Sequence, residues 1–199
     1  MSQVLVIESS ARTQGSVSRQ LTGEFISHWQ AAHPADTVTV RDLARDPVPH
    51  LDATLLGGWM TPADQQSEAE QAALARSNLL TDELLAADVL VLAAPMYNFG
   101  IPSTLKAWLD HVLRAGVTFK YSETGPQGLL SGKRAIVLTA RGGIYAGGSM
   151  DHQEPYLRQA LAFIGIHDVR FVHAEGLNLG AEFLERGVAG AKAQLTELV

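Results

Sequence analysis

The stretch DVLVLAAPMYNFGIPSTLKAWLDHV, residues 88–112, is the part of the sequence that indicates the fold most clearly. A strand is predicted over residues 88–94, and residues 89–94 form a continuous apolar run, which is typical of a strand covered on both faces of a parallel sheet. The end of the stretch places four large apolar residues at helical spacing: Leu105, Trp108, Leu109 and Val112. A buried strand followed at once by an amphipathic helix predicts a βα unit, with residues 95–102 as the connecting loop.

The same pattern recurs along the chain. Further strands are predicted over residues 3–8, 37–42, 134–140 and 168–173, and helical spacing of apolar residues lies between them. Strands that alternate with helices predict an α/β fold with a five-stranded parallel sheet. The run TVTVRD alternates in polarity, which favours an edge strand. At 199 residues, the length is that of one domain, 1–199.

Composition excludes several classes of protein. The net charge is −6 and no lysine- or arginine-rich run exists, which argues against a nucleic-acid surface. No apolar run reaches the roughly 18 residues of a membrane span, and the opening MSQVLVIESS predicts no secretory leader. The chain has no cysteine, so disulfides, thiolate metal sites and a cysteine nucleophile are absent. We expect a cytoplasmic protein without a membrane or nucleic-acid partner.

The loop after the first strand, residues 9–19, is rich in hydroxyl groups. Ser16 and Ser18 stand where a helix is expected to begin, so they could bind a phosphate group or simply cap the helix. Gly15 stands alone, so neither a G-x-G-x-x-G fingerprint nor a Walker A loop is present. Asp42, which could otherwise bind a ribose, lacks the glycines that should accompany it. A mononucleotide phosphate fits this loop better than a dinucleotide.

The loop of residues 95–102 follows the third strand. Tyr97 and Phe99 offer flat apolar surface, and Asn98 offers a donor and an acceptor to the edge of a ring. The alternative is that the two rings cap the core, while the prolines mark turns and Ser103 caps the next helix.

The loop after the fourth strand contains Gly142 and Gly143, which permit close approach of a flat ligand to the backbone. The carboxyl ends of parallel strands share one edge of the sheet, where ligands of such folds bind. Three loops of this kind at one edge favour a ligand with a phosphate and a flat ring. Flavin mononucleotide (FMN) has that shape.

These residues carry a resemblance to a known family. The chain resembles the FMN-dependent NADH azoreductases, a branch of the flavodoxin-like quinone reductases. The similar segments are QVLVIESS, TVRDL, AAPMYNF, LKAWLDHV, RAGVTFKY, GPQGLLSGK, ARGG, PYL, FIGI and AEG, which together cover nearly the whole chain. The resemblance implies a flavodoxin-like sheet of strand order 2-1-3-4-5 with helices on both faces.

The resemblance also implies the residues that bind FMN. The phosphate and its neighbouring hydroxyls would contact Ser10, Ser16, Val17 and Ser18. The ring system would be bordered by Met96, Tyr97, Asn98 and Phe99, and its pyrimidine edge by Ala140, Arg141, Gly142 and Gly143. Further pocket walls would come from Phe119, Tyr121 and Phe163, and from Trp59 and Met60 in the family's variable region.

The family works as a homodimer in which the partner chain completes each flavin site. The long segment of residues 45–62 has no clear helical period, and it would contribute apolar surface to the partner's pocket or form a short helix with a packing turn. The implied reaction has two half-reactions in one pocket: NADH or NADPH reduces FMN, and a quinone or azo compound then takes the electrons.

No protein acid or base is required by that reaction, so the sequence names no catalytic residue. The seven histidines show no metal-ligand spacing, and His111 is placed on the polar flank of its helix. A proton relay through Asp151 and His152 beside Tyr145 is a minor alternative. At the level of the whole protein, one alternative is a flavin-binding electron carrier or redox-responsive binding protein without a small-molecule acceptor. Another is a nicotinamide-only dehydrogenase, and the missing glycine fingerprint argues against that one.

Overall fold

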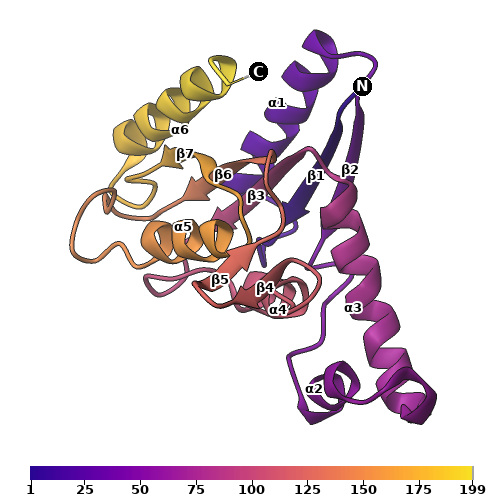
Figure 1. Cartoon of the computed structure of the whole chain (residues 1–199). Coiled ribbons are helices and arrows are strands. Elements are labelled where there is room, and N and C mark those ends of the chain that lie inside the picture. The colour runs from indigo at the N-terminus through magenta and orange to yellow at the C-terminus, as the bar shows by residue number, and fades with distance from the viewer. Residues whose placement is uncertain (199) are drawn as a thin grey trace.

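The computed structural model describes residues 1–198 and is built on a five-stranded parallel sheet (Figure 1). The strands are β1 (Gln3–Glu8), β2 (Thr37–Asp42), β3 (Val89–Pro95), β6 (Arg134–Ala140) and β7 (Asp168–Ala174), each within one residue of its predicted bounds. Their spatial order is β2-β1-β3-β6-β7, and every neighbouring pair is parallel. This confirms the predicted order 2-1-3-4-5 and places the switch in strand order between β1 and β3.

Helices cover both faces of the sheet (Figure 1). One face packs against α1 (Val17–Ala32) and α6 (Ala181–Thr196), and the other against α3 (Glu68–Ala86), α4 (Ser103–Val112) and α5 (Gln153–Phe163). In β1, Val4 and Val6 belong to the first core and Leu5 and Ile7 to the second. Alternating side chains of one strand thus enter two cores, which is why the central strands are apolar throughout.

The segment of residues 45–62 contains a helix, α2 (Ala53–Met60), followed by the short 3-10 helix η1 (Ala63–Gln65). Asp52 caps α2 by accepting from the Leu55 N–H at 2.9 Å. Gly58 lets α2 approach α3, because a Cβ there would lie 3.0 Å from the Leu74 side chain. Since the helix has only two turns, its apolar period was too short to recognise. α2 and the start of α3 extend beyond the sheet (Figure 1).

The side chain of His111 is buried, with 2% of its surface exposed, so its placement on a polar helix flank was wrong. Its Nε2 lies 2.9 Å from the carbonyl oxygen of Pro49. Burial lowers the pKa of His111, so the neutral ring donates from Nε2 and ties α4 to the segment that leads into α2.

A two-stranded antiparallel hairpin, β4 (Phe119–Ser122) and β5 (Gly125–Gly128), lies outside the main sheet and was not predicted. Its strands are four residues each, and glycine and proline occupy most of the second, so the sequence carries little strand signal. Gly128 is needed where the hairpin meets the turn after α5, because a Cβ there would lie 2.1 Å from the Gly165 nitrogen.

Within residues 1–198, no helix has both the length and the apolar character that crossing a bilayer requires.

Candidate functional site

A cavity of about 530 Å³ opens at the carboxyl edge of the sheet. It is formed by the loops after β1, β3, β6 and β7, as expected for the switch point of such a sheet. Seven of the predicted cofactor-binding residues line it: Ser10, Ser16, Val17, Met96, Tyr97, Ala140 and Gly142. The volume falls in the range of about 300–1,000 Å³ that is common for small-molecule sites.

The first wall of this cavity is a cluster of serine hydroxyls at the N-terminus of α1. Ser16 is the N-cap of the helix, and its Oγ accepts from the Arg19 N–H at 3.4 Å. The same Oγ donates to Ser10 Oγ at 2.9 Å and lies 3.1 Å from Ser18 Oγ. Helix capping and anion binding are therefore compatible here, because the hydroxyls meet at the positive end of a helix.

The side chain of Arg19 holds this loop in place through hydrogen bonds. Its guanidinium binds Asp42 with two contacts of 2.7 and 2.8 Å and donates to the carbonyl oxygens of Ser10 and Arg12 at 3.1 and 2.8 Å. The hydrogen bond from Arg19 lowers the pKa of Asp42. Asp42 is thus committed to an ion pair that fixes the loop, and its carboxylate is not directed to a ribose.

Glu8, the last residue of β1, lies close to the same loop and is 5% exposed. Its Oε2 has no hydrogen-bond partner among the residues that the structure describes. Burial raises the pKa of Glu8, although a hydrogen bond from Thr22 and the charge of Arg19 act in the opposite direction. Burial thus shifts Glu8 toward its neutral form, which repels an anion at the helix N-terminus less than a carboxylate does.

The loop of Met96–Gly100 forms a tight turn. The Tyr97 N–H donates to the Gly100 oxygen at 3.0 Å, and the Gly100 N–H donates back to Tyr97 at 3.1 Å. The central residues Asn98 and Phe99 have φ values of 49° and 69°, as in a type I′ turn. The turn's own hydrogen bonds, and not only the flanking prolines, fix this loop.

A phenylalanine in the left-handed region is strained, and backbone strain of this kind is concentrated at functional sites. Phe99 is nevertheless 47% exposed, so burial in the core does not explain its conformation. The Tyr97 hydroxyl accepts from the Ala11 N–H at 3.2 Å and so joins this loop to the one after β1. Tyr97 lines the cavity and Phe99 is exposed, so the two rings do not cap the core. Ser103 is the first residue of α4, and Pro102 precedes it without a side-chain cap, so the capping role of Ser103 was wrong.

The loop after β6 presents backbone N–H groups in one direction. The carbonyl groups of residues 141, 142 and 143 accept from the N–H groups of residues 177, 178 and 176, at 3.1, 2.9 and 2.9 Å. In a trans peptide the N–H points opposite to the C=O, so the N–H groups of Gly142, Gly143 and Ile144 point away from the loop after β7.

These three groups, here termed the N–H array, therefore face the side of β3 and the loop of Met96–Gly100. They donate to no acceptor within residues 1–198. Consecutive free N–H groups of this kind bind anions and carbonyl oxygens.

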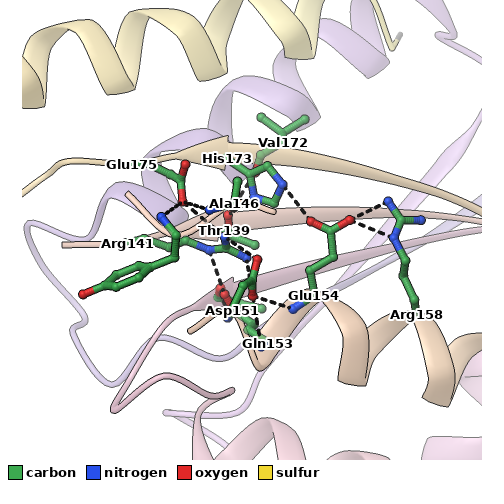
Figure 2. Close-up of polar contacts among 12 residues, drawn as sticks. Thr139, Arg141, Ala146, Asp151, Gln153, Glu154, Arg158, Val172, His173 and Glu175 are labelled. Carbon is green, nitrogen blue, oxygen red and sulfur yellow. Dashed lines mark hydrogen bonds and ion pairs between the residues drawn. The ribbon is translucent and has the colours of Figure 1, made fainter. Parts of the chain in front are cut away.

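Arg141 itself does not reach the cavity. Its side chain is completely buried and binds Asp151 Oδ2 at 2.9 Å, Gln153 Oε1 at 3.1 Å and Glu175 Oε1 at 3.2 Å (Figure 2). Its backbone N–H donates to Ala174, and its carbonyl oxygen accepts from the loop after β7. Arg141 therefore binds protein groups on either side of the loop that carries the N–H array, and its side chain does not enter the cavity.

The same geometry excludes the proton relay through Asp151. Burial works against the charge of Asp151, but hydrogen bonds from the Glu154 N–H and the Arg141 guanidinium outweigh it, so its pKa lies below the ordinary value. Both carboxylate oxygens are bound to protein atoms, and His152 is exposed. Asp151 therefore has no unbound oxygen through which a proton could pass between His152 and Tyr145.

The five predicted substrate-binding residues lie outside the cavity of their own chain. Trp59 and Met60 are on α2, and Met60 is 86% exposed. The ring of Phe119 lies tilted against that of Phe163, with centroids 4.5 Å apart, and edge to face with Tyr121 at 5.5 Å, so the other three form one aromatic cluster on β4 and α5. Ser18, Asn98 and Gly143 are not among the lining residues but adjoin them in the chain, and Phe99 lies two residues beyond Tyr97.

The cavity also contains residues that the sequence did not single out. They are Arg12, Gly15, Pro95, Leu177, Asn178 and Leu184. The last three come from the loop after β7 and the start of α6. The signal that would have found them is topological, because every strand of a parallel sheet delivers its following loop to the same edge.

Comparison with known proteins agrees with this architecture. The profile of a family described by a flavodoxin-like fold matches residues 2–199. The FMN-dependent NADH:quinone oxidoreductase of Azotobacter vinelandii is 76% identical over 198 residues, which is 100% of both chains. FMN-dependent NADH:quinone oxidoreductase 3 of Pseudomonas aeruginosa is 71% identical over 99% of this chain and 92% of its own. The solved structure of an FMN-dependent NADH-azoreductase from Bacillus anthracis, in complex with FMN, is 30% identical with a TM-score of 0.89, over 100% and 99% of the two chains.

Proposed function

The chain belongs to the family of FMN-dependent NADH:quinone oxidoreductases with a flavodoxin-like fold, and we propose that it uses FMN and NADH to reduce quinones and aromatic azo compounds. Bound FMN supplies the two-electron carrier between the nicotinamide and the acceptor, and the protein positions that carrier and excludes competing reactions. The observation that carries the proposal is the meeting, in one cavity, of a hydroxyl-lined helix N-terminus with a free N–H array.

The residues present fit FMN at both of its ends. The hydroxyls of Ser10, Ser16 and Ser18 and the N–H of Val17 are proposed to bind the phosphate, at the positive end of a helix of 16 residues. The dianionic phosphate matches the absence of an acidic side chain among the residues that line this part of the cavity. No metal ion is required in this arrangement.

Between the two ends, Met96, Tyr97, Asn98 and Phe99 are proposed to border the ring system, with Ala140, Gly142 and Gly143 at its pyrimidine edge. The N–H array would stabilise the negative charge that develops there on reduction, by the same physics as an oxyanion hole. Arg141 receives a supporting role only, because its side chain and its backbone bind protein atoms.

We propose that the active protein is a homodimer in which each chain completes the other's site. Trp59, Met60, Phe119, Tyr121 and Phe163 lie outside the cavity of their own chain. Met60 and Tyr121 are 86% and 73% exposed, and α2 extends beyond the sheet (Figure 1). These residues are proposed as acceptor-binding residues of the partner's pocket. A location in the cytoplasm is proposed with this, since the chain lacks the cysteines that are typical of secreted proteins.

The test begins with FMN titration of the protein stripped of flavin, followed by anaerobic addition of NADH or NADPH. Expected are tight FMN binding, loss of the yellow colour with NADH, and its return when a quinone or an azo dye is added. Failure to bind FMN would overturn the proposal. A yellow protein that NADH does not bleach would instead support the alternative of an electron carrier that exchanges electrons with a protein partner. Sedimentation analysis tests the homodimer.

A further inference from the structure

Glu175 is the first residue after β7, and one of its carboxylate oxygens accepts three hydrogen bonds. Oε1 accepts from the N–H groups of Tyr145 and Ala146 at 2.8 and 2.9 Å, and from Arg141 Nη1 at 3.2 Å (Figure 2). A carboxylate of the strand β7 thus holds the backbone of the loop after β6. No role in the function proposed above has been given to it.

These bonds determine where the N–H array ends. The three peptide groups that join residues 141 to 144 direct their C=O toward the loop after β7, and so they direct the N–H groups of Gly142, Gly143 and Ile144 away from it. At Tyr145 and Ala146 this direction reverses, because their N–H groups turn back to Glu175. Without the carboxylate, both N–H groups would bind water in an exposed, glycine-rich segment, and the preceding turn would lose its anchor.

The same bonds position an aromatic ring. The ring of Tyr145 lies against Gly143, since a Cβ there would be 2.8 Å from its Cζ and Oη atoms. It also meets the ring of Phe99 edge to face, with centroids 6.0 Å apart. Glu175 therefore fixes, through the backbone of Tyr145, a contact between the loop after β6 and the loop after β3.

The carboxylate is itself immobile. Arg141 binds it from the buried side, and Arg141 is held in turn by Asp151 and Gln153 (Figure 2). Gln153 donates from Nε2 to the carbonyl oxygen of Ala94, at 2.8 Å, near the end of β3. A chain of hydrogen bonds thus links Glu175, after β7, to Arg141, after β6, and through Gln153 to Ala94 of β3.

We propose that Glu175 is a positioning residue of the flavin site, which holds the loop after β6 in the conformation that presents the N–H array and the Tyr145 ring. The proposal rests on the proposed function in that the ligand is FMN. It assigns Glu175 no contact with FMN or substrate. Its effect is to arrange, before binding, donors that the ligand would otherwise have to order.

The test compares Glu175→Ala with Glu175→Gln, which keeps an acceptor oxygen at the same place. Glu154→Gln is the matched control, because Glu154 belongs to the same polar network but binds His173 and Arg158 (Figure 2). The alanine variant should fold, because Asp151 still pairs with the buried Arg141. Should it not fold, Glu175→Asp replaces it, since this keeps the charge but withdraws the oxygens from Tyr145 and Ala146.

Amide hydrogen exchange is measured first, in protein stripped of flavin. Exchange at Tyr145 and Ala146 should accelerate by about tenfold or more in Glu175→Ala, since bonds to a charged acceptor are lost. It should change little in Glu175→Gln and not at all in Glu154→Gln. The dissociation constant for FMN should rise by about tenfold in the alanine variant and be largely restored in the glutamine variant.

Unchanged exchange in the alanine variant would overturn the proposal, as would faster exchange with unchanged FMN affinity. If the unmodified protein fails to bind FMN, the proposed function fails, while the exchange measurement still decides whether Glu175 holds the loop.

Discussion

Replacing Ser16 by aspartate places a negative charge where the FMN phosphate is proposed to bind, and leaves the fold intact. Aspartate is as good an N-cap as serine, and a carboxylate at a helix N-terminus is stabilising. The protein without flavin should therefore be at least as stable as the unmodified one. Ser16→Asn is the neutral control, since asparagine has the same shape as aspartate, carries no charge and also caps helices.

The magnitude follows from the place of this side chain. The Ser16 hydroxyl lies 2.9 Å from Ser10 Oγ and 3.1 Å from Ser18 Oγ, so a carboxylate there stands inside the proposed phosphate-binding cluster. Two unit charges about 4–6 Å apart repel each other by about 3–4 kcal/mol at an effective dielectric constant of about 20, and by about 1 kcal/mol in water. Ser16 is half-buried, which places it between these limits. A loss of about 2 kcal/mol corresponds to a roughly 30-fold weaker affinity for FMN.

The assay is fluorescence titration of each flavin-free variant with FMN and, separately, with riboflavin, which has no phosphate. The aspartate variant should bind FMN about 30-fold more weakly than the asparagine variant, at low salt. Riboflavin should bind the two variants equally. Equal FMN affinity of the two variants would refute the placement of the phosphate at α1. Unequal riboflavin affinity would show that the charge acts through the fold.

Three further perturbations test the surrounding structure. Burial raises the pKa of Glu8 above 4.5, so the stability that this group contributes is present below about pH 4.5 and is lost as the pH rises through its folded-state value. In urea unfolding, Glu8→Gln should therefore gain stability relative to the unmodified protein as the pH rises above about 4.5; a pH-independent difference would contradict this. Gly128→Ala should cost about 3 kcal/mol, because its Cβ would lie 2.1 Å from the Gly165 nitrogen, whereas Gly23→Ala, with open space around it, should not destabilise. Phe99→Gly should stabilise the flavin-free protein by about 1 kcal/mol in thermal unfolding, by relieving the positive φ, and should weaken FMN binding; lower stability would contradict a strained turn.

Sequence reasoning predicted the main sheet because the determinants are local and strong. The continuous apolar runs of β1, β3 and β6 reflect burial on both faces, and the alternating run of β2 reflects an edge. The hairpin of β4 and β5 was missed because its strands have only four residues each and the second is mostly glycine and proline, which leaves little strand signal. For residues 45–62 the sequence left a short helix as one of two alternatives, because the two turns of α2 are too few to show an apolar period.

The residues of the candidate site were also predicted only in part. The hydroxyls of the first loop and the glycines of the loop after β6 were found because parallel strands deliver these loops to one edge. Arg141 was misjudged, since a sequence motif does not reveal into which layer a side chain points. The loop after β7 was passed over because Leu177 and Asn178 carry no chemical signature of their own.

Periodicity and composition are enough to predict an α/β fold with a five-stranded parallel sheet, and the sequence motifs are enough to recognise the family and, through it, the strand order. They are properties of neighbours along the chain, where 2.0- and 3.6-residue periods translate directly into exposed and buried faces. The tertiary structure decides what depends on distant partners: that Asp42 is an ion-pair partner of Arg19, that Arg141 is buried, and that Glu175 holds two N–H groups of another loop. A polar side chain takes its role from the groups that satisfy it, and these are assembled only when the sheet brings its loops together.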